Sequence, residues 1–75
     1  MVSMVAVLVP KQLVGKRVRF LDGEVVGTIK GVSRVSSSGA YEEVVIQQGE
    51  GIVRVRAKDL IPSGNEFICR GMVYS

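Results

Sequence analysis

Polar and apolar side chains alternate along residues 16–21, which predicts a half-buried β-strand near the start of the chain. Val18 and Phe20 fall on one face of this strand, while Arg17 and Arg19 fall on the other. Successive side chains of a strand point to opposite faces of its sheet, so the pattern places the apolar face in a core and the arginines in solvent.

A second strand is expected over residues 24–35, directly after the Asp22-Gly23 dipeptide. This dipeptide suits the positive φ angles of a tight turn, and it predicts a β-hairpin between the two strands. Gly27 and Gly31 interrupt the second strand, where glycine usually marks a bulge, a bend or a close backbone approach. Two such positions on one strand indicate the curvature by which a small sheet closes into a barrel.

A second hairpin is predicted from residues 41–48 and 52–56, joined by a tight reversal at residues 49–51. The strand over residues 52–56 repeats the alternation of the first strand, with Arg54 and Arg56 on its outward face. Short strands separated by glycine-containing turns are typical of small all-β folds.

Shorter elements are expected in the rest of the chain. Residues 57–60 are predicted to form a single helical or 3₁₀ turn, which residues 62–65 end because proline, glycine and asparagine favour turns. Residues 67–70 are the last short strand, with residues 71–74 as a candidate extension, and residues 36–39 form a polar loop. We therefore predict an all-β fold, a small β-barrel with short antiparallel strands and one helical turn.

Length and composition agree with a single β-rich domain. A chain of 75 residues builds one domain. Valine is its dominant apolar residue, and valine fits a pleated sheet better than a helix because its side chain is stiff at χ1. We expect residues 13–70 to form the barrel, residues 1–12 an apolar N-terminal strand extension and residues 71–75 a C-terminal extension.

The first nine residues are almost wholly apolar. A secretory signal would need a basic start, and no basic residue precedes Lys11. A membrane span would need about 20 apolar residues. We therefore predict a strand that ends at Pro10, in a cytoplasmic protein without direct membrane insertion. Because both faces of this strand are apolar, it is buried on its own barrel or pairs with another chain. The expected dimer interface comprises Val2, Met4, Val5, Val7, Leu8, Val9, Val73 and Tyr74.

The sequence offers little for catalysis, and we expect no enzyme, no cofactor and no metal site. Histidine is absent, and the single cysteine, Cys69, has no neighbouring base that would activate it. Glu42 and Glu43 are adjacent on a strand, so they point to opposite faces and cannot share a reacting proton. The glycines of the first hairpin are not followed by the Gly-Lys-Ser/Thr ending of a phosphate-binding loop.

A net charge of +3 makes the outward arginines the candidate partner-binding residues. If their strands are neighbours, four guanidinium groups form one basic patch, which Lys16 or Lys58 extends. Such a patch would bind an acidic protein tail or nucleic-acid phosphates, or would be a solvated face without a partner. RNA binding would in addition require aromatic side chains among the cations. The predicted partner-binding residues are Arg17, Arg19, Arg54 and Arg56. Replacement of the last two by glutamate is expected to leave folding intact and to weaken partner binding.

Three segments of the chain resemble the PRC-barrel family, a small SH3-like β-barrel found in the photosynthetic reaction centre and attached to a ribosome maturation factor. They are Leu-Val-Gly-Lys-Arg-Val at residues 13–18, Asp-Gly-Glu-Val-Val-Gly-Thr-Ile at 22–29, and Val-Arg-Ala-Lys-Asp-Leu-Ile-Pro-Ser-Gly-Asn-Glu-Phe-Ile at 55–68. Many family members carry an acidic residue after the second strand, where this chain has Gly-Val-Ser-Arg at 31–34. The resemblance implies the barrel fold more specifically than it implies a function.

Small stand-alone archaeal PRC-barrel proteins are similar to this chain, and the resemblance implies a role in FtsZ-based cell division. The expected function is that of a non-enzymatic adaptor that binds the membrane-anchoring adaptor SepF and is recruited to the division site. The expected assembly is a homodimer, or a heterodimer with a related PRC-barrel protein. The alternative is an RNA- or ribosome-associated barrel, whose affinity for RNA would fall steeply with salt.

Overall fold

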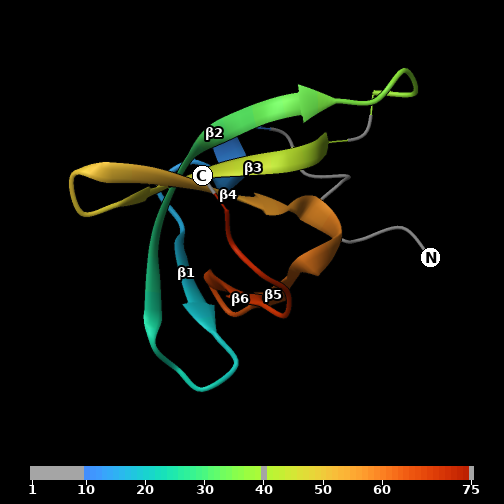
Figure 1. Cartoon of the computed structure of the whole chain (residues 1–75). Coiled ribbons are helices and arrows are strands. Elements are labelled where there is room, and N and C mark those ends of the chain that lie inside the picture. The colour runs from blue at the N-terminus through green and yellow to red at the C-terminus, as the bar shows by residue number, and fades with distance from the viewer. Residues whose placement is uncertain (1–9, 40, 75) are drawn as a thin grey trace.

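Six strands in one sheet make up most of the protein (Figure 1). The computed structural model describes residues 10–39 and 41–74. The sheet has the strand order β4-β3-β2-β1-β6-β5, which confirms the small all-β fold. In chain order the elements are α1 (Pro10–Leu13), β1 (Arg17–Phe20), β2 (Val25–Val35), β3 (Tyr41–Gln48), β4 (Gly51–Arg56), the 3₁₀ helix η2 (Ala57–Asp59), β5 (Leu60–Ser63) and β6 (Glu66–Cys69).

Both predicted hairpins are present. β1 and β2 pair antiparallel, and Gly23 adopts a φ of 92° in the turn between them. The turn is closed by a hydrogen bond from the Gly23 amide to the Phe20 carbonyl at 2.9 Å. β3 and β4 also pair antiparallel, and their turn places Gly49 at a φ of 59°. Local turn chemistry thus determines two of the strand pairs in the sheet.

The pairing of the last two strands differs from the prediction. β6 lies parallel to β1, with Val18 opposite Phe67, whereas only antiparallel strands were expected. Leu60–Ser63 is a strand, β5, although we predicted the end of a helical turn at residue 60 and a turn over residues 62–65. β5 is the last strand in the sheet order and pairs with β6 alone. An edge strand tolerates Pro62 because backbone amides on its open side need not donate hydrogen bonds to a neighbouring strand.

The described helices are short. The predicted single turn is confirmed as η2, and the four residues of α1 are helical where we predicted a strand ending at Pro10. The strand expected before Pro10 lies outside the described residues. In the part of the chain that the structure describes, no helix has the length and hydropathy needed to cross a membrane.

β2 bends along its eleven residues, so that its first part pairs with β1 and its longer second part with β3 (Figure 1). Gly27 lies at this change of partner. A side chain is excluded there, because a Cβ atom would be 2.1 Å from the backbone oxygen of Gln47. The register between β2 and β3 shifts between Ile29 and Gly31. Both glycines predicted to mark a close approach or a bulge therefore lie at such places.

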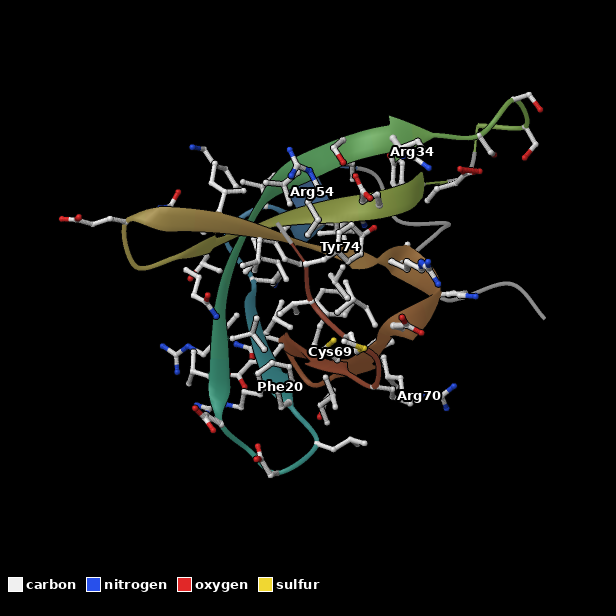
Figure 2. The ribbon with its side chains drawn as sticks, viewed as in Figure 1. Phe20, Arg34, Arg54, Cys69, Arg70 and Tyr74 are labelled. Carbon is white, nitrogen blue, oxygen red and sulfur yellow. The ribbon has the colours of Figure 1, made fainter. Side chains whose placement is uncertain are left out.

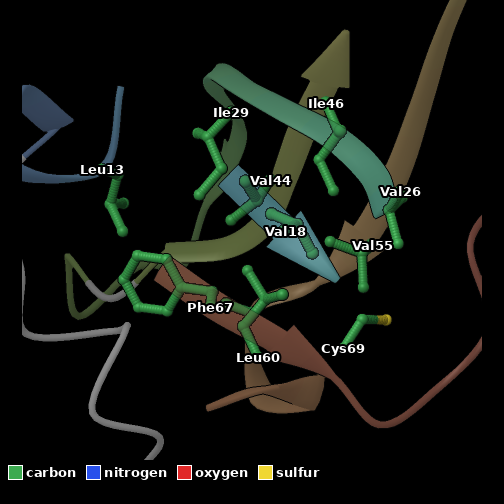
Figure 3. Close-up of a cluster of buried hydrophobic side chains, with 11 residues drawn as sticks. Leu13, Val18, Val26, Ile29, Val44, Ile46, Val55, Leu60, Phe67 and Cys69 are labelled. Atoms are coloured by element: carbon green, nitrogen blue, oxygen red, sulfur yellow. The ribbon is translucent and has the colours of Figure 1, made fainter. Parts of the chain in front are cut away.

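The core lies against the concave side of the bent sheet and draws on every strand and on α1 (Figure 3). Phe20 is partly buried against this core, as the alternation in β1 predicted. Nearly all of the fully enclosed side chains are aliphatic, in agreement with the valine-rich composition. The buried residues are Leu13, Val18, Val26, Ile29, Val44, Ile46, Val55, Ala57, Leu60, Phe67 and Cys69.

The C-terminal segment returns to the opposite end of the sheet. Tyr74 forms an isolated antiparallel bridge with Arg54 of β4, in which the Tyr74 amide donates to the Arg54 carbonyl at 2.9 Å. Val73 is partly buried against the core. Both residues, which we assigned to a dimer interface, therefore contact their own chain. The other predicted interface residues lie outside the described residues, and the dimer stays a prediction.

Candidate functional site

The predicted patch of four arginines is not formed, because the strands that carry them are not neighbours. β1 holds Arg17 and Arg19, β4 holds Arg54 and Arg56, and β2 and β3 lie between these strands in the sheet. The prediction required β1 and β4 to be adjacent. The structure divides the four arginines between two separate surfaces.

The first surface is the outer face of β1 and β6, where two arginines share one carboxylate. Arg19 donates from Nε to Glu66 Oε1 at 2.9 Å, and Arg17 Nη1 lies 3.7 Å from Glu66 Oε2. Arg19 also donates from Nη1 to the Gly23 carbonyl at 2.9 Å. One negative charge beside two positive charges leaves this group of three side chains with a net positive charge.

Apolar side chains lie next to these arginines on the same face. The strand register places Val25, Arg19, Ile68 and Ile61 side by side across β2, β1, β6 and β5. Val25 is 47% exposed and Ile61 36% exposed, whereas Ile68 is half-buried. We call Val25, Ile68 and Ile61 the apolar row. Sequence reasoning missed it because the row exists only through the parallel pairing of β1 with β6.

The second surface surrounds Glu43 of β3, a carboxylate that is almost fully buried. Glu43 accepts hydrogen bonds from the hydroxyl groups of Ser33 and Tyr74, and Arg54 Nε lies 3.6 Å from its Oε1. Its neighbour Glu42 is exposed, so the two carboxylates occupy different environments, in line with their alternation along the strand.

The hydrogen bonds of this cluster shift two pKa values in opposite directions. The hydrogen bonds from Ser33 and then Tyr74 hold the pKa of Glu43 below its usual value, with help from Arg34 and Arg54 and against the effect of burial. The hydrogen bond to Glu43, together with burial, raises the pKa of the Tyr74 phenol. Glu43 is therefore the ionised acceptor of the cluster, and Tyr74 is a neutral donor.

A groove of about 300 Å³ opens beside this cluster, and we call it the basic groove. Figure 2 shows Arg34, Arg54 and Tyr74 in this part of the molecule, where β2, β3 and β4 lie together. Among the described residues, the cations that line the groove have no carboxylate oxygen within 4.0 Å, in contrast to Arg17, Arg19 and Arg54. We call these three side chains, Arg34, Arg56 and Lys58, the groove cations. The full lining is Arg34, Tyr41, Glu42, Glu43, Arg56, Lys58 and Tyr74.

Sequence reasoning found only part of the groove. The alternation in β4 indicated Arg56, and Lys58 was expected to extend the same patch. Arg34 was not predicted because the β2–β3 register shifts on both sides of it, which interrupts the alternation of side chains between the two faces of β2. Tyr74 reaches the groove only through its bridge to Arg54, and no local pattern encodes that bridge.

The environment of Arg54 changes one expectation. Arg54 faces Glu43, so the substitution Arg54→Glu would place a second carboxylate beside one that is nearly buried. Like charges at short distance in a poorly solvated place repel, and we now expect this substitution to destabilise the fold. Arg56, whose side chain is exposed, is the better position for testing binding.

Neutralisation of Glu43 is expected to alter the pH dependence of stability. The pKa of Glu43 is lower in the folded than in the unfolded chain, so its contribution is present above the ordinary value of 4.5 and is lost as the pH falls through the folded value. In the variant Glu43→Gln the free energy of unfolding should lie below that of the unaltered protein at about pH 6, and the difference should shrink towards about pH 3. Urea unfolding at a series of pH values measures this difference. Glu42→Gln, at the adjacent exposed position, is the matched control, and a gap for Glu43→Gln that is constant with pH would contradict the prediction.

The remaining chemically reactive group is enclosed. Cys69 is buried, its thiol donates to the Gly71 carbonyl at 3.3 Å, and burial raises the pKa of the thiol. A thiol with a raised pKa is a poor nucleophile because the reactive form is the thiolate. Within residues 10–39 and 41–74, no group of three or more histidine, cysteine, aspartate or glutamate side chains is arranged to hold a metal ion.

Comparison with models of known protein families finds no match to this chain, and no curated protein matches its sequence. The resemblance to PRC-barrel proteins therefore stays a prediction, based on the three segments between residues 13 and 68.

Proposed function

We propose that this protein is a non-enzymatic adaptor that binds another protein through the outer face of β1, β6 and β5. The observation that carries this proposal is the apolar row beside the ion pairs of Arg17 and Arg19 with Glu66. Protein interfaces combine an apolar centre with a polar rim, and arginine is enriched in them. The face has both parts on a rigid sheet.

The charge of this face indicates the chemistry of the partner. Glu66 offsets only one of the two arginines, so the complementary surface carries exposed apolar side chains next to an aspartate or glutamate. Leu21, which is 71% exposed, is a further exposed apolar side chain directly after the end of β1. The expected complex is a transient one, because the row contains few large side chains.

The resemblance to archaeal PRC-barrel proteins supplies the first partner for testing. It supports a place in FtsZ-based cell division, with SepF as the bound protein and the division site as the place of action. The same resemblance supports self-association, or association with a related PRC-barrel protein. Both remain proposals that rest on the matching segments of the sequence.

A charged group within the apolar row should strongly weaken partner binding. Ile61→Asp is expected to weaken the binding of purified SepF at least tenfold, because the partner's apolar side chains would face a desolvated carboxylate. Isothermal titration calorimetry measures the affinity, and circular dichroism confirms that the fold is kept. The matched control is Ile52→Asp on β4, where the replaced isoleucine is 40% exposed, close to the 36% of Ile61.

Two outcomes would overturn the proposal in different ways. Equal weakening, or none, in Ile61→Asp and Ile52→Asp would remove the binding site from the outer face of β1, β6 and β5. Failure of the unaltered protein to bind SepF would refute the assignment of the partner.

A further inference from the structure

The basic groove lies on the second surface, apart from the apolar row, and the adaptor function leaves it unused. Its floor and walls come from β2, β3, the end of β4, η2 and the C-terminal segment. The groove cations stem from three different elements, yet they surround one opening. An arrangement of this kind attracts an anionic ligand.

The carboxylates of the groove do not neutralise the groove cations. Arg54, which is not part of the lining, lies 3.6 Å from Glu43 and offsets its charge, while the neutral hydroxyl groups of Ser33 and Tyr74 donate hydrogen bonds to it. Glu42 is the second carboxylate in the lining, and its single negative charge is outnumbered by the positive charges of the three groove cations. The site therefore keeps a positive charge, and its ligand carries more than one negative charge along its length.

Two tyrosine rings line the groove together with these cations. They distinguish anionic polymers that carry stacking bases from acidic peptides, which have none. Tyr41 is half-buried on β3, and Tyr74 is 39% exposed on the C-terminal segment. The Tyr74 ring is held at both ends, by its hydroxyl on Glu43 and by its backbone bridge to Arg54 (Figure 2). A fixed ring loses little entropy when a ligand stacks on it, and bases stack on aromatic side chains whatever their sequence.

We propose that the basic groove is a binding site for single-stranded RNA, with phosphates on the groove cations and an unpaired base against both Tyr41 and Tyr74. Single-stranded nucleic acid is bound by a positively charged groove that carries aromatic side chains, and the basic groove has both parts. An acidic peptide would use the cations but would leave the rings without a role. The volume of about 300 Å³ is at the small end of ligand sites, which fits one unpaired nucleotide better than a duplex.

The test measures the binding of a short fluorescein-labelled single-stranded RNA of mixed sequence by fluorescence anisotropy, with the full chain. Three phosphate contacts predict a slope of about −2 in a plot of log affinity against log salt concentration. Removal of one contact, in Arg34→Ala or Lys58→Ala, should make the slope shallower by about 0.7. Lys30→Ala is the matched control, because Lys30 is an exposed cation on β2 outside the groove.

The aromatic contribution is tested separately. Tyr41→Leu should weaken RNA binding about tenfold, whereas Tyr41→Phe keeps the ring and should bind like the unaltered protein. Thermal unfolding of both variants shows whether Tyr41→Leu is still folded at the temperature of the measurement, since Tyr41 also packs against the core. If Tyr41→Leu fails this check, the salt slopes of Arg34→Ala and Lys58→Ala decide.

Three results would overturn the proposal. The first is a lack of RNA binding at about 50 mM salt, where phosphate contacts are strong. The second is equal weakening by Lys30→Ala and Lys58→Ala, which would indicate attraction by the net charge alone. The third is competition by an oligoglutamate peptide at the same affinity together with full binding by a folded Tyr41→Leu, which would assign the groove to acidic protein segments. Ile61→Asp should bind RNA normally, so the two proposals fail independently.

Discussion

The substitution Gly27→Ala is expected to destabilise the protein by about 3 kcal/mol, a large share of the total stability of a small domain. An added Cβ atom would lie 2.1 Å from the Gln47 carbonyl oxygen and 2.8 Å from Cγ2 of Ile46. The first of these atoms belongs to the backbone, so no rotamer change relieves the contact. β2 and β3 would have to move apart at the point where β2 changes its partner from β1 to β3. Urea unfolding followed by circular dichroism measures the loss.

The same substitution at Gly31 is the matched control. Gly31 lies on the same strand, has no positive φ angle, and a Cβ atom there would meet no other atom within 4 Å. Gly31→Ala should therefore leave stability unchanged or raise it by about 0.5 kcal/mol, because alanine restricts the unfolded chain. Equal stability of Gly27→Ala and Gly31→Ala would show that β2 and β3 do not approach as closely as described.

The substitution Ile46→Ala is expected to cost about 2–5 kcal/mol, through lost burial and the cavity left behind. Ile46 is completely enclosed, and its neighbours in register are Ile29 on β2 and Val53 on β4. The core is small, so few side chains can move to fill the space. Chemical denaturation with urea gives the free energy of unfolding of the variant and of the unaltered chain.

The matched comparison is Ile52→Ala on the neighbouring strand. Ile52 is the same residue type, but 40% of it is exposed, so its truncation removes less buried surface and leaves no enclosed cavity. We expect a loss of about 0.5 kcal/mol or less there. Losses of similar size at Ile46 and Ile52 would mean that the enclosed core contributes little to the stability of this fold.

The hairpins were predictable because the signals that specify them are local. The alternation in β1 and the Asp22-Gly23 turn lie within a few residues of each other, and they fix a pair of strands without reference to the rest of the chain. The same holds for β3 and β4 around Gly49. The curvature of β2 was predictable as well, because glycine within an otherwise β-rich run usually marks a bend, a bulge or a close backbone approach.

The parallel pairing of β1 with β6 was not predictable from such signals. This pairing brings the side chains of Arg19 and Glu66 together, although they are 47 residues apart. The residues between them hold no pattern that specifies the two strands as neighbours. β5 was missed for a related reason. Pro62 indicates a turn when it is considered with its neighbours, and only the position of β5 at the edge of the sheet makes proline acceptable in a strand.

The contrast between local signals and contacts of distant residues also explains which parts of the candidate sites were predictable. Alternation correctly indicated that Arg17, Arg19 and Arg56 lie outside the core, but it carries no information on which strands are adjacent. The apolar row and the basic groove both depend on adjacency, the first through β6 and the second through Tyr74. The alternation within a single sequence shows which side chains are exposed more readily than it shows which of them are in contact.

Two features of the sheet edges also affect the tendency of the protein to aggregate at high concentration. They are Pro62 on β5 and the bridge between Tyr74 and Arg54. An open sheet edge offers unpaired amide and carbonyl groups, and strands of other molecules can add to it until chains aggregate. Pro62 removes one amide donor from β5, and Tyr74 occupies the amide and carbonyl of Arg54 on β4. A small sheet protein whose edges are blocked in this way can accumulate at high local concentration with less tendency to aggregate.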